Sequence, residues 1–186
     1  MRNIEDFDVL MLPGWRGSGP EHWQTHWEAA FPAMRRVEQA DWAHPVYADW
    51  ARNLAAAVAG SDRPVVLIAH SLANALVARW AKQADTRKIA GAFMVATSDI
   101  DRFAGTPEFT VRGFDPLVLE PLPFPAVVLA SRNDERVSLQ RARQFAAAWG
   151  AQFVDVGERG HIGSAANLGL WPQGLVLFGQ FIASLD

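Results

Sequence analysis

Residues 65–76 read VVLIAHSLANAL. The run begins with five apolar residues, which is typical of a strand buried on both faces of a parallel sheet. From Leu72 onward the apolar residues follow helical spacing. The stretch therefore predicts a buried strand, a sharp turn at Ser71 and a helix. Because ligands of parallel α/β sheets bind at the carboxyl ends of the strands, we expect the Ser71 hydroxyl to face a crevice.

Short apolar runs alternate with longer helical patterns along the rest of the chain, which indicates an α/β fold with a parallel sheet. A single domain is expected, because 186 residues can bury a substantial core. The expected strands are residues 8–14, 35–42 near a sheet edge, 64–70, 89–99, 124–134 and 151–160. The expected helices are residues 22–31, 47–60, 72–83, 138–150 and 174–185. Proline and glycine break any period in residues 99–124, which predicts an irregular excursion within reach of the site.

Composition excludes several classes of function. A net charge of -3 with 20% charged residues gives no polyanion-binding surface, so nucleic acid is not an expected partner. The absence of cysteine excludes disulfides, thiolate nucleophiles and cysteine zinc sites. The segment MRNIEDFDVLML has acidic residues where a signal peptide is basic, and its apolar run is too short to span a membrane. A cytoplasmic location without membrane contact is therefore expected.

The turn at Ser71 resembles a nucleophile elbow, which is usually written G-x-S-x-G. Here it reads Ala69-His70-Ser71-Leu72-Ala73, so that alanine replaces both glycines and adds one methyl group at each position. A serine at a strand-to-helix junction is equally well explained as a helix N-cap. The two interpretations differ in what else must be present, because a nucleophilic serine needs a base and a carboxylate.

Both partners are found after later strands. Asp134 follows the run ending at residue 130, and His161 lies in a glycine-rich loop after the last strand. The resulting order, Ser71, Asp134, His161, is that of the α/β-hydrolases. Taken alone, Asp134 also suits a turn beside Asn133. Other carboxylates remain possible for the role of the acid, namely Asp99 and Asp101, with Glu135 and Asp155 as weaker rivals.

An acyl-transfer site also needs backbone donors for the oxyanion. Leu72 is expected to supply one N–H, and the loop after the first strand the other, through the amide of Trp15 or Arg16, of which we prefer Trp15. Gly14 permits close approach there. Further residues expected to line the pocket are Gly14, Arg16, His70, Trp42 and Trp171.

Two other readings of the N-terminal loop and helix carry less weight. Glycines at 14, 17 and 19 suggest a phosphate-binding turn, but their spacing matches neither G-x-G-x-x-G nor the P-loop, and no lysine follows. His22 and His26 are one helical turn apart, yet no third ligand accompanies them at suitable spacing, so surface or packing roles are expected. The sequence indicates neither a metal nor a cofactor.

Four stretches carry a resemblance to a known family. They are LPGWRGSGPEHWQTHWE at 12–28, AHSLA at 69–73, ASRNDERVS at 130–138 and GERGHIGSAANLGLWPQG at 157–174. They resemble the small serine hydrolases of the retinoblastoma-binding protein 9 and YdeN-like group. The resemblance implies a compact α/β-hydrolase of about six mainly parallel strands, with helices on both faces and no large lid. It also implies that Ser71 is the nucleophile, Asp134 the acid and His161 the base. The two elbow alanines and Glu135, where proline is frequent, depart from the family pattern.

Serine hydrolysis through an acyl-enzyme is the predicted function, with carboxylesterase-like action on small or medium acyl groups and a small ester or amide as substrate. The alternative is a noncatalytic protein-interaction module on the same fold. An L-x-C-x-E motif, the type associated with retinoblastoma-protein binding, cannot occur without cysteine. The sequence identifies no protein partner.

Overall fold

The computed structural model describes residues 2–185. Its six strands form one sheet in the order β2-β1-β3-β4-β5-β6, and every neighbouring pair is parallel. The strands are β1 (Asp8–Leu12), β2 (Met34–Arg36), β3 (Val65–His70), β4 (Ile89–Val95), β5 (Ala126–Ala130) and β6 (Gln152–Asp155). The predicted α/β class and the six-stranded parallel sheet are therefore confirmed.

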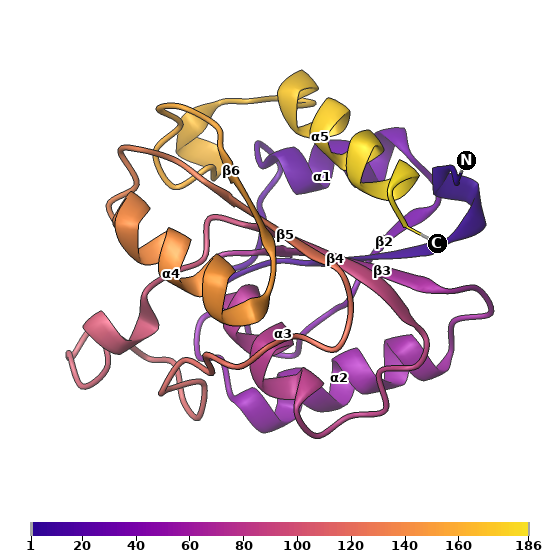
Figure 1. Cartoon of the computed structure of the whole chain (residues 1–186). Helices are drawn as coiled ribbons and strands as arrows, with labels where there is room; N and C mark the ends of the chain where they lie inside the picture. Colours follow the sequence, from indigo (N-terminus) through magenta and orange to yellow (C-terminus); the bar gives the residue numbers. More distant parts are fainter. Residues whose placement is uncertain (1, 186) are drawn as a thin grey trace.

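Helices cover both faces of the sheet, as Figure 1 shows. The helices are α1 (Trp23–Ala30), α2 (Tyr47–Ala59), α3 (Leu72–Ala81), α4 (Leu139–Trp149) and α5 (Pro172–Ala183). One buried cluster joins α2, α3 and α4 to the sheet, and a second joins α1 and α5 to its opposite face. Since the sheet lies between the two helical layers, only its edges and its strand ends can present a site.

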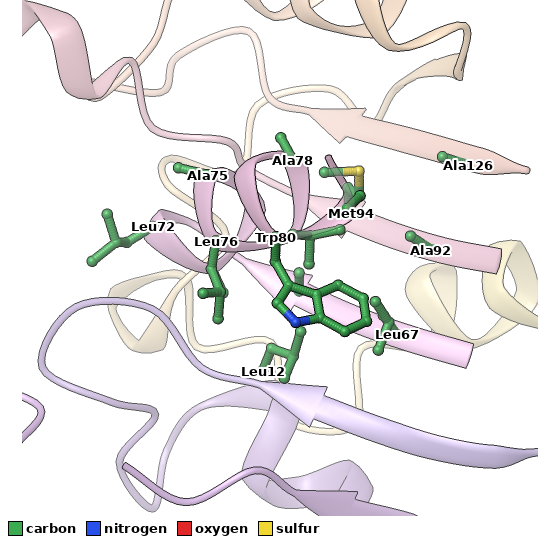
Figure 2. Close-up of a cluster of buried hydrophobic side chains, with 14 of the residues drawn as sticks. Leu12, Leu67, Leu72, Ala75, Leu76, Ala78, Trp80, Ala92, Met94 and Ala126 are labelled. Atoms are coloured by element: carbon green, nitrogen blue, oxygen red, sulfur yellow. The ribbon is translucent and has the colours of Figure 1, made fainter. Parts of the chain in front are cut away.

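Alternate strand residues belong to the two clusters. Leu67 of β3 packs on the α3 side, whereas Ile68 packs on the α1 side, and both are fully buried. Figure 2 shows the α3 side, where Leu76 and Trp80 point toward the strands that carry Leu12 and Leu67. Complete burial of each such side chain contributes roughly 1.5–3 kcal/mol. Burial on both faces explains why β3 reads as a continuous apolar run rather than an alternating one.

Several elements differ in their bounds from the sequence prediction. Residues 35–42 were predicted as an edge strand, and β2 does lie at the edge, but it covers only Met34–Arg36. The Val37 N–H still donates to the Met11 carbonyl at 2.9 Å, after which the chain leaves the sheet. The last helix begins at Pro172, two residues earlier than predicted, because proline suits the first helical turn.

The predicted irregular excursion is confirmed. Between β4 and β5 the chain forms only a 3₁₀ turn at Ile100–Arg102 and an isolated bridge between Val46 and Arg112. Two further 3₁₀ turns lie at Ile4–Asp6 and Ser164–Ala166. Within residues 2–185, no helix combines the length and the apolar character that a bilayer crossing requires.

Candidate active site

Ser71 occupies a strained turn between β3 and α3. Its backbone lies at φ 59° and ψ -119°, a conformation that costs a non-glycine residue about 1–3 kcal/mol. Its N–H donates to the Val95 carbonyl at the end of β4, at 3.0 Å. The side chain makes no capping hydrogen bond to α3, so the N-cap interpretation is wrong. The Ser71 hydroxyl is therefore available for hydrogen bonds to side chains beyond the end of β3.

His161 joins this hydroxyl to a carboxylate. Its Nε2 lies 2.8 Å from Ser71 Oγ, and its Nδ1 lies 2.9 Å from each oxygen of Asp134. Because a carboxylate only accepts hydrogen bonds, Nδ1 carries the imidazole proton and Nε2 is left to accept from the Ser71 hydroxyl. The ends of β3, β5 and β6 thus bring together the three side chains that the sequence singled out.

Asp134 is the carboxylate that reaches His161. Its side chain is completely buried, and one of its oxygens also accepts from the Arg136 N–H at 2.8 Å. Asp99 and Asp101 lie beside Arg141 instead, at 3.4 Å and 3.9 Å. The weaker rivals are engaged elsewhere too, Asp155 with Arg132 and Glu135 with Arg136.

The loop that carries His161 is held by side chains from two distant segments. The Trp23 indole donates to the Ile162 carbonyl at 2.8 Å, and the His70 ring lies with Nε2 3.0 Å from the His161 carbonyl. Ile162 itself has φ 50°, which is unfavourable for a β-branched residue. The surrounding contacts therefore fix a loop conformation that its own sequence disfavours.

Two buried histidines beside this loop stay uncharged. Burial lowers the pKa of His22 to about 3, and burial also holds the pKa of His70 well below its usual range. The positive charge of Arg36 and the neighbouring imidazoles lower the pKa of His22 further, and the imidazoles of His22 and His161 lower that of His70 further. A neutral His70 donates its Nε2 proton to the His161 carbonyl and adds no positive charge next to His161.

Two polar residues that the sequence did not assign to the site join the acid loop to the histidine loop. Asn133 Oδ1 accepts from the Gly160 N–H at 2.8 Å, and Ser131 Oγ accepts from the Arg159 N–H at 2.8 Å. The Ser131 hydroxyl also donates to Asn133 Oδ1 at 2.9 Å. Polar side chains directly after the buried strand β5 were the available signal, but Asn133 was interpreted only as a turn residue.

The expected oxyanion donors lie on either side of the elbow. The Arg16 N–H donates to the Trp42 carbonyl at 2.8 Å, so this amide is occupied. Within residues 2–185, the N–H groups of Trp15 and Leu72 donate to no protein acceptor. Gly14 brings the first loop against the elbow, since a Cβ there would lie 2.8 Å from the Ser71 Cβ. Of the two amides considered, Trp15 is the one left available.

If the Trp15 amide is an oxyanion donor, replacing Gly14 with alanine is expected to lower kcat by about 10²–10³, the loss caused by removing one such donor. The added methyl group would lie 2.8 Å from the Ser71 Cβ, 2.9 Å from the His70 carbonyl oxygen and 3.3 Å from the Leu72 nitrogen, so the first loop and the elbow could not keep their present separation. Gly19→Ala is the matched control, because a Cβ there meets no atom within 4 Å. Steady-state kinetics of both variants measure the effect. Equal kcat values for the two would contradict this account of the loop.

A cavity of about 420 Å³ opens above Ser71, a size typical of small-molecule sites. Its wall is mainly apolar and comes largely from the excursion, through Ile100, Phe103, Phe109 and Val111. Ser71, Leu72, Ser98 and His161 line its floor, and Trp15, Arg16, Thr106, Glu108 and Arg136 complete the lining. The irregular segment thus builds much of the pocket wall.

Arg16 lines this cavity as expected, but four other expected lining residues do not. Gly14 and His70 are buried against the elbow. Trp42 packs edge-on against Trp50, with ring centroids 5.3 Å apart. Trp171 is buried with α1 and α5 on the other face of the sheet. The Trp171 assignment failed because residue type alone does not reveal which side of the sheet a loop residue packs on. Trp42 is on the same side of the sheet as the cavity wall but packs against Trp50 of α2.

Within the part of the chain that the structure describes, no three metal-ligating side chains come together. His22 is instead buried, and its Nδ1 accepts from the Gln24 N–H at 3.1 Å, which caps α1. A packing role is therefore correct for His22.

A parallel sheet with a strained serine elbow at its centre defines the α/β-hydrolase class. Comparisons with known proteins agree with this classification. A solved structure described as a YdeN-like hydrolase from Pectobacterium atrosepticum is 33% identical, covering 96% of this chain and 92% of that one with a TM-score of 0.86. The ydeN gene product of Bacillus subtilis is 16% identical, with 96% and 100% covered and a TM-score of 0.75. The esterase RhEst1 from Rhodococcus sp. is 18% identical, with 100% and 94% covered and a TM-score of 0.70.

The model of the family described as serine hydrolase matches residues 9–180. The chain therefore belongs to this serine hydrolase family and is a small YdeN-like member with the α/β-hydrolase fold. No curated protein matches the chain.

Proposed function

We propose that this hydrolase cleaves small or medium acyl esters through an acyl-enzyme, with Ser71 as nucleophile, His161 as base and Asp134 as the orienting acid. The observation that carries the proposal is the position of the His161 ring, 2.8 Å from Ser71 Oγ and 2.9 Å from both Asp134 oxygens. These distances are within the range for direct proton transfer. All six strands belong to one sheet, so in this proposal the whole chain acts as a single domain.

The first step transfers the acyl group to the enzyme. The Ser71 proton moves to His161 Nε2, while Ser71 Oγ forms a bond to the ester carbonyl carbon. The carbonyl π electrons move to oxygen, where the N–H groups of Trp15 and Leu72 stabilise the negative charge. Asp134 stabilises the imidazolium that forms. The tetrahedral intermediate then collapses, and His161 gives its proton to the leaving alcohol.

The second step returns the enzyme to its starting state. His161 removes a proton from water, the resulting hydroxide attacks the acyl carbon, and the carboxylic acid leaves as the proton returns to Ser71. The cavity has a volume of about 420 Å³ and a mainly apolar wall, which suits a small or medium acyl chain. The proposal includes no metal or cofactor step.

Labelling with a fluorophosphonate tests the proposal directly, since only an activated serine attacks phosphorus at a useful rate. The intact protein is expected to gain one covalent adduct, located at Ser71 by peptide mass spectrometry, and to hydrolyse p-nitrophenyl butyrate. Ser71→Ala should do neither. Equal labelling of both proteins would overturn the assignment of the nucleophile. Absence of both labelling and hydrolysis in the intact protein would favour the noncatalytic interaction module.

A further inference from the structure

Ser98 lies in the loop after β4, and its hydroxyl contacts the proposed nucleophile. The two oxygens, Ser98 Oγ and Ser71 Oγ, are 2.9 Å apart. Ser98 is 91% buried, since its relative exposure is 9%, and it lines the floor of the cavity. This contact plays no part in a mechanism that uses Ser71, His161 and Asp134 alone.

The direction of this hydrogen bond follows from the protons available. His161 Nδ1 must donate to the Asp134 carboxylate, so Nε2 has only a lone pair to offer Ser71. Ser71 therefore donates its single hydroxyl proton in the hydrogen bond to His161 Nε2. The contact with Ser98 is left to the Ser98 proton, and Ser71 Oγ accepts it through a lone pair.

Backbone contacts hold Ser98 in this position. Ala96, two residues earlier, has φ 49° and donates its N–H to the Leu129 carbonyl at 2.9 Å. The Ile100 N–H donates to the Ser98 carbonyl at 3.0 Å. The Asp99 N–H donates to the Arg136 carbonyl at 3.2 Å, which ties the loop to the segment that carries Asp134. Ser98 is thus part of the same hydrogen-bonded framework as the acid.

We propose that Ser98 is a further catalytic residue, whose hydroxyl donates to Ser71 Oγ and stabilises the negative charge that this oxygen carries during catalysis. Charge develops on Ser71 Oγ twice, when its proton leaves for His161 and when the bond to the acyl carbon breaks in the second step. A hydrogen bond to an ionised oxygen is roughly twice as strong as a neutral one. Ser98 keeps its own proton throughout, so no additional proton transfer is needed. The inference rests on the proposed function.

Ser98→Ala removes the donor without adding volume, and it is expected to lower kcat for p-nitrophenyl butyrate by about 10- to 100-fold, less than the loss of an oxyanion donor. The rate of fluorophosphonate labelling should fall by a similar factor. KM should change less than twofold, because the hydrogen bond that is lost is to the enzyme's own oxygen, Ser71 Oγ. Thermal unfolding of the variant checks that the fold is retained.

Ser98→Thr and Ser98→Val form a matched pair that separates the hydroxyl from its volume, since both add similar bulk and only threonine can donate. We expect Thr to retain at least ten times the kcat of Val. Equal rates for Thr and Val, or a Ser98→Ala rate within twofold of the intact protein, would overturn the role of Ser98 and leave the proposed function standing. An intact protein that neither labels nor hydrolyses esters would instead overturn the proposed function itself.

Discussion

His161→Ala is expected to lower kcat for ester hydrolysis by about 10⁶, the loss that follows removal of the base from a serine–histidine pair. Without the imidazole, Ser71 has no acceptor for its proton and stays a neutral, weak nucleophile. The substitution leaves a cavity next to Ser71, at a site where the imidazole is only 18% exposed. Added imidazole is therefore expected to restore part of the lost rate. Steady-state kinetics with and without imidazole measure both effects.

Two comparisons make this prediction specific. Groups that act as one unit are not additive, so the double variant Ser71→Ala with His161→Ala should be no slower than either single variant. His26→Ala is the control for removal of a histidine, because His26 is partly exposed on α1 and does not line the cavity. A fully additive double variant would mean that Ser71 and His161 do not work together.

The three site residues were predictable because parallel strands end at the same edge of a sheet. Each of Ser71, Asp134 and His161 lies in the turn or loop that follows a strand, so the sheet itself brings them together. The sequence pattern left two roles open, the capping role of Ser71 and the choice among carboxylates. Side-chain geometry supports one choice for each, through the missing capping bond at Ser71 and the position of Asp134 at His161.

Ser98 was missed although it obeys the same rule. In the sequence, Asp99 and Asp101 after β4 are candidates for the acid, whereas Ser98 matches no motif. Ser98 lies near Ser71 because β4 is the neighbour of β3 in the sheet. A single sequence does not reveal which strands are neighbours. Val95 at the end of β4 accepts the Ser71 N–H, and Ser98 follows three residues later.

Trp171 was misplaced for a different reason. It has φ 44°, its side chain is buried, and a Cβ on Gly174 would lie 2.2 Å from its ring. The glycine in α5 is thus the place where the indole packs, and the segment 157–174 includes both residues. A glycine three residues after a tryptophan is compatible with close packing of the indole, but it does not by itself distinguish a core tryptophan from one that lines a pocket.

Asp134→Asn is expected to lower kcat by about 10⁴ while the fold is retained, since asparagine has nearly the same shape. The amide NH₂ group would face His161 Nδ1 and favour the tautomer that carries its proton on Nε2, which can no longer accept from Ser71. Asp99→Asn and Asp101→Asn are the matched controls, because both carboxylates lie near Arg141 and neither contacts His161. They should keep kcat within a few-fold of the intact protein.

A large loss in Asp99→Asn or Asp101→Asn, with Asp134→Asn unaffected, would move the acid to the loop after β4. The short distances between Asp134 and His161 make the opposite result the expected one, because a buried carboxylate with both oxygens 2.9 Å from Nδ1 leaves the ring one orientation in which Nε2 faces Ser71.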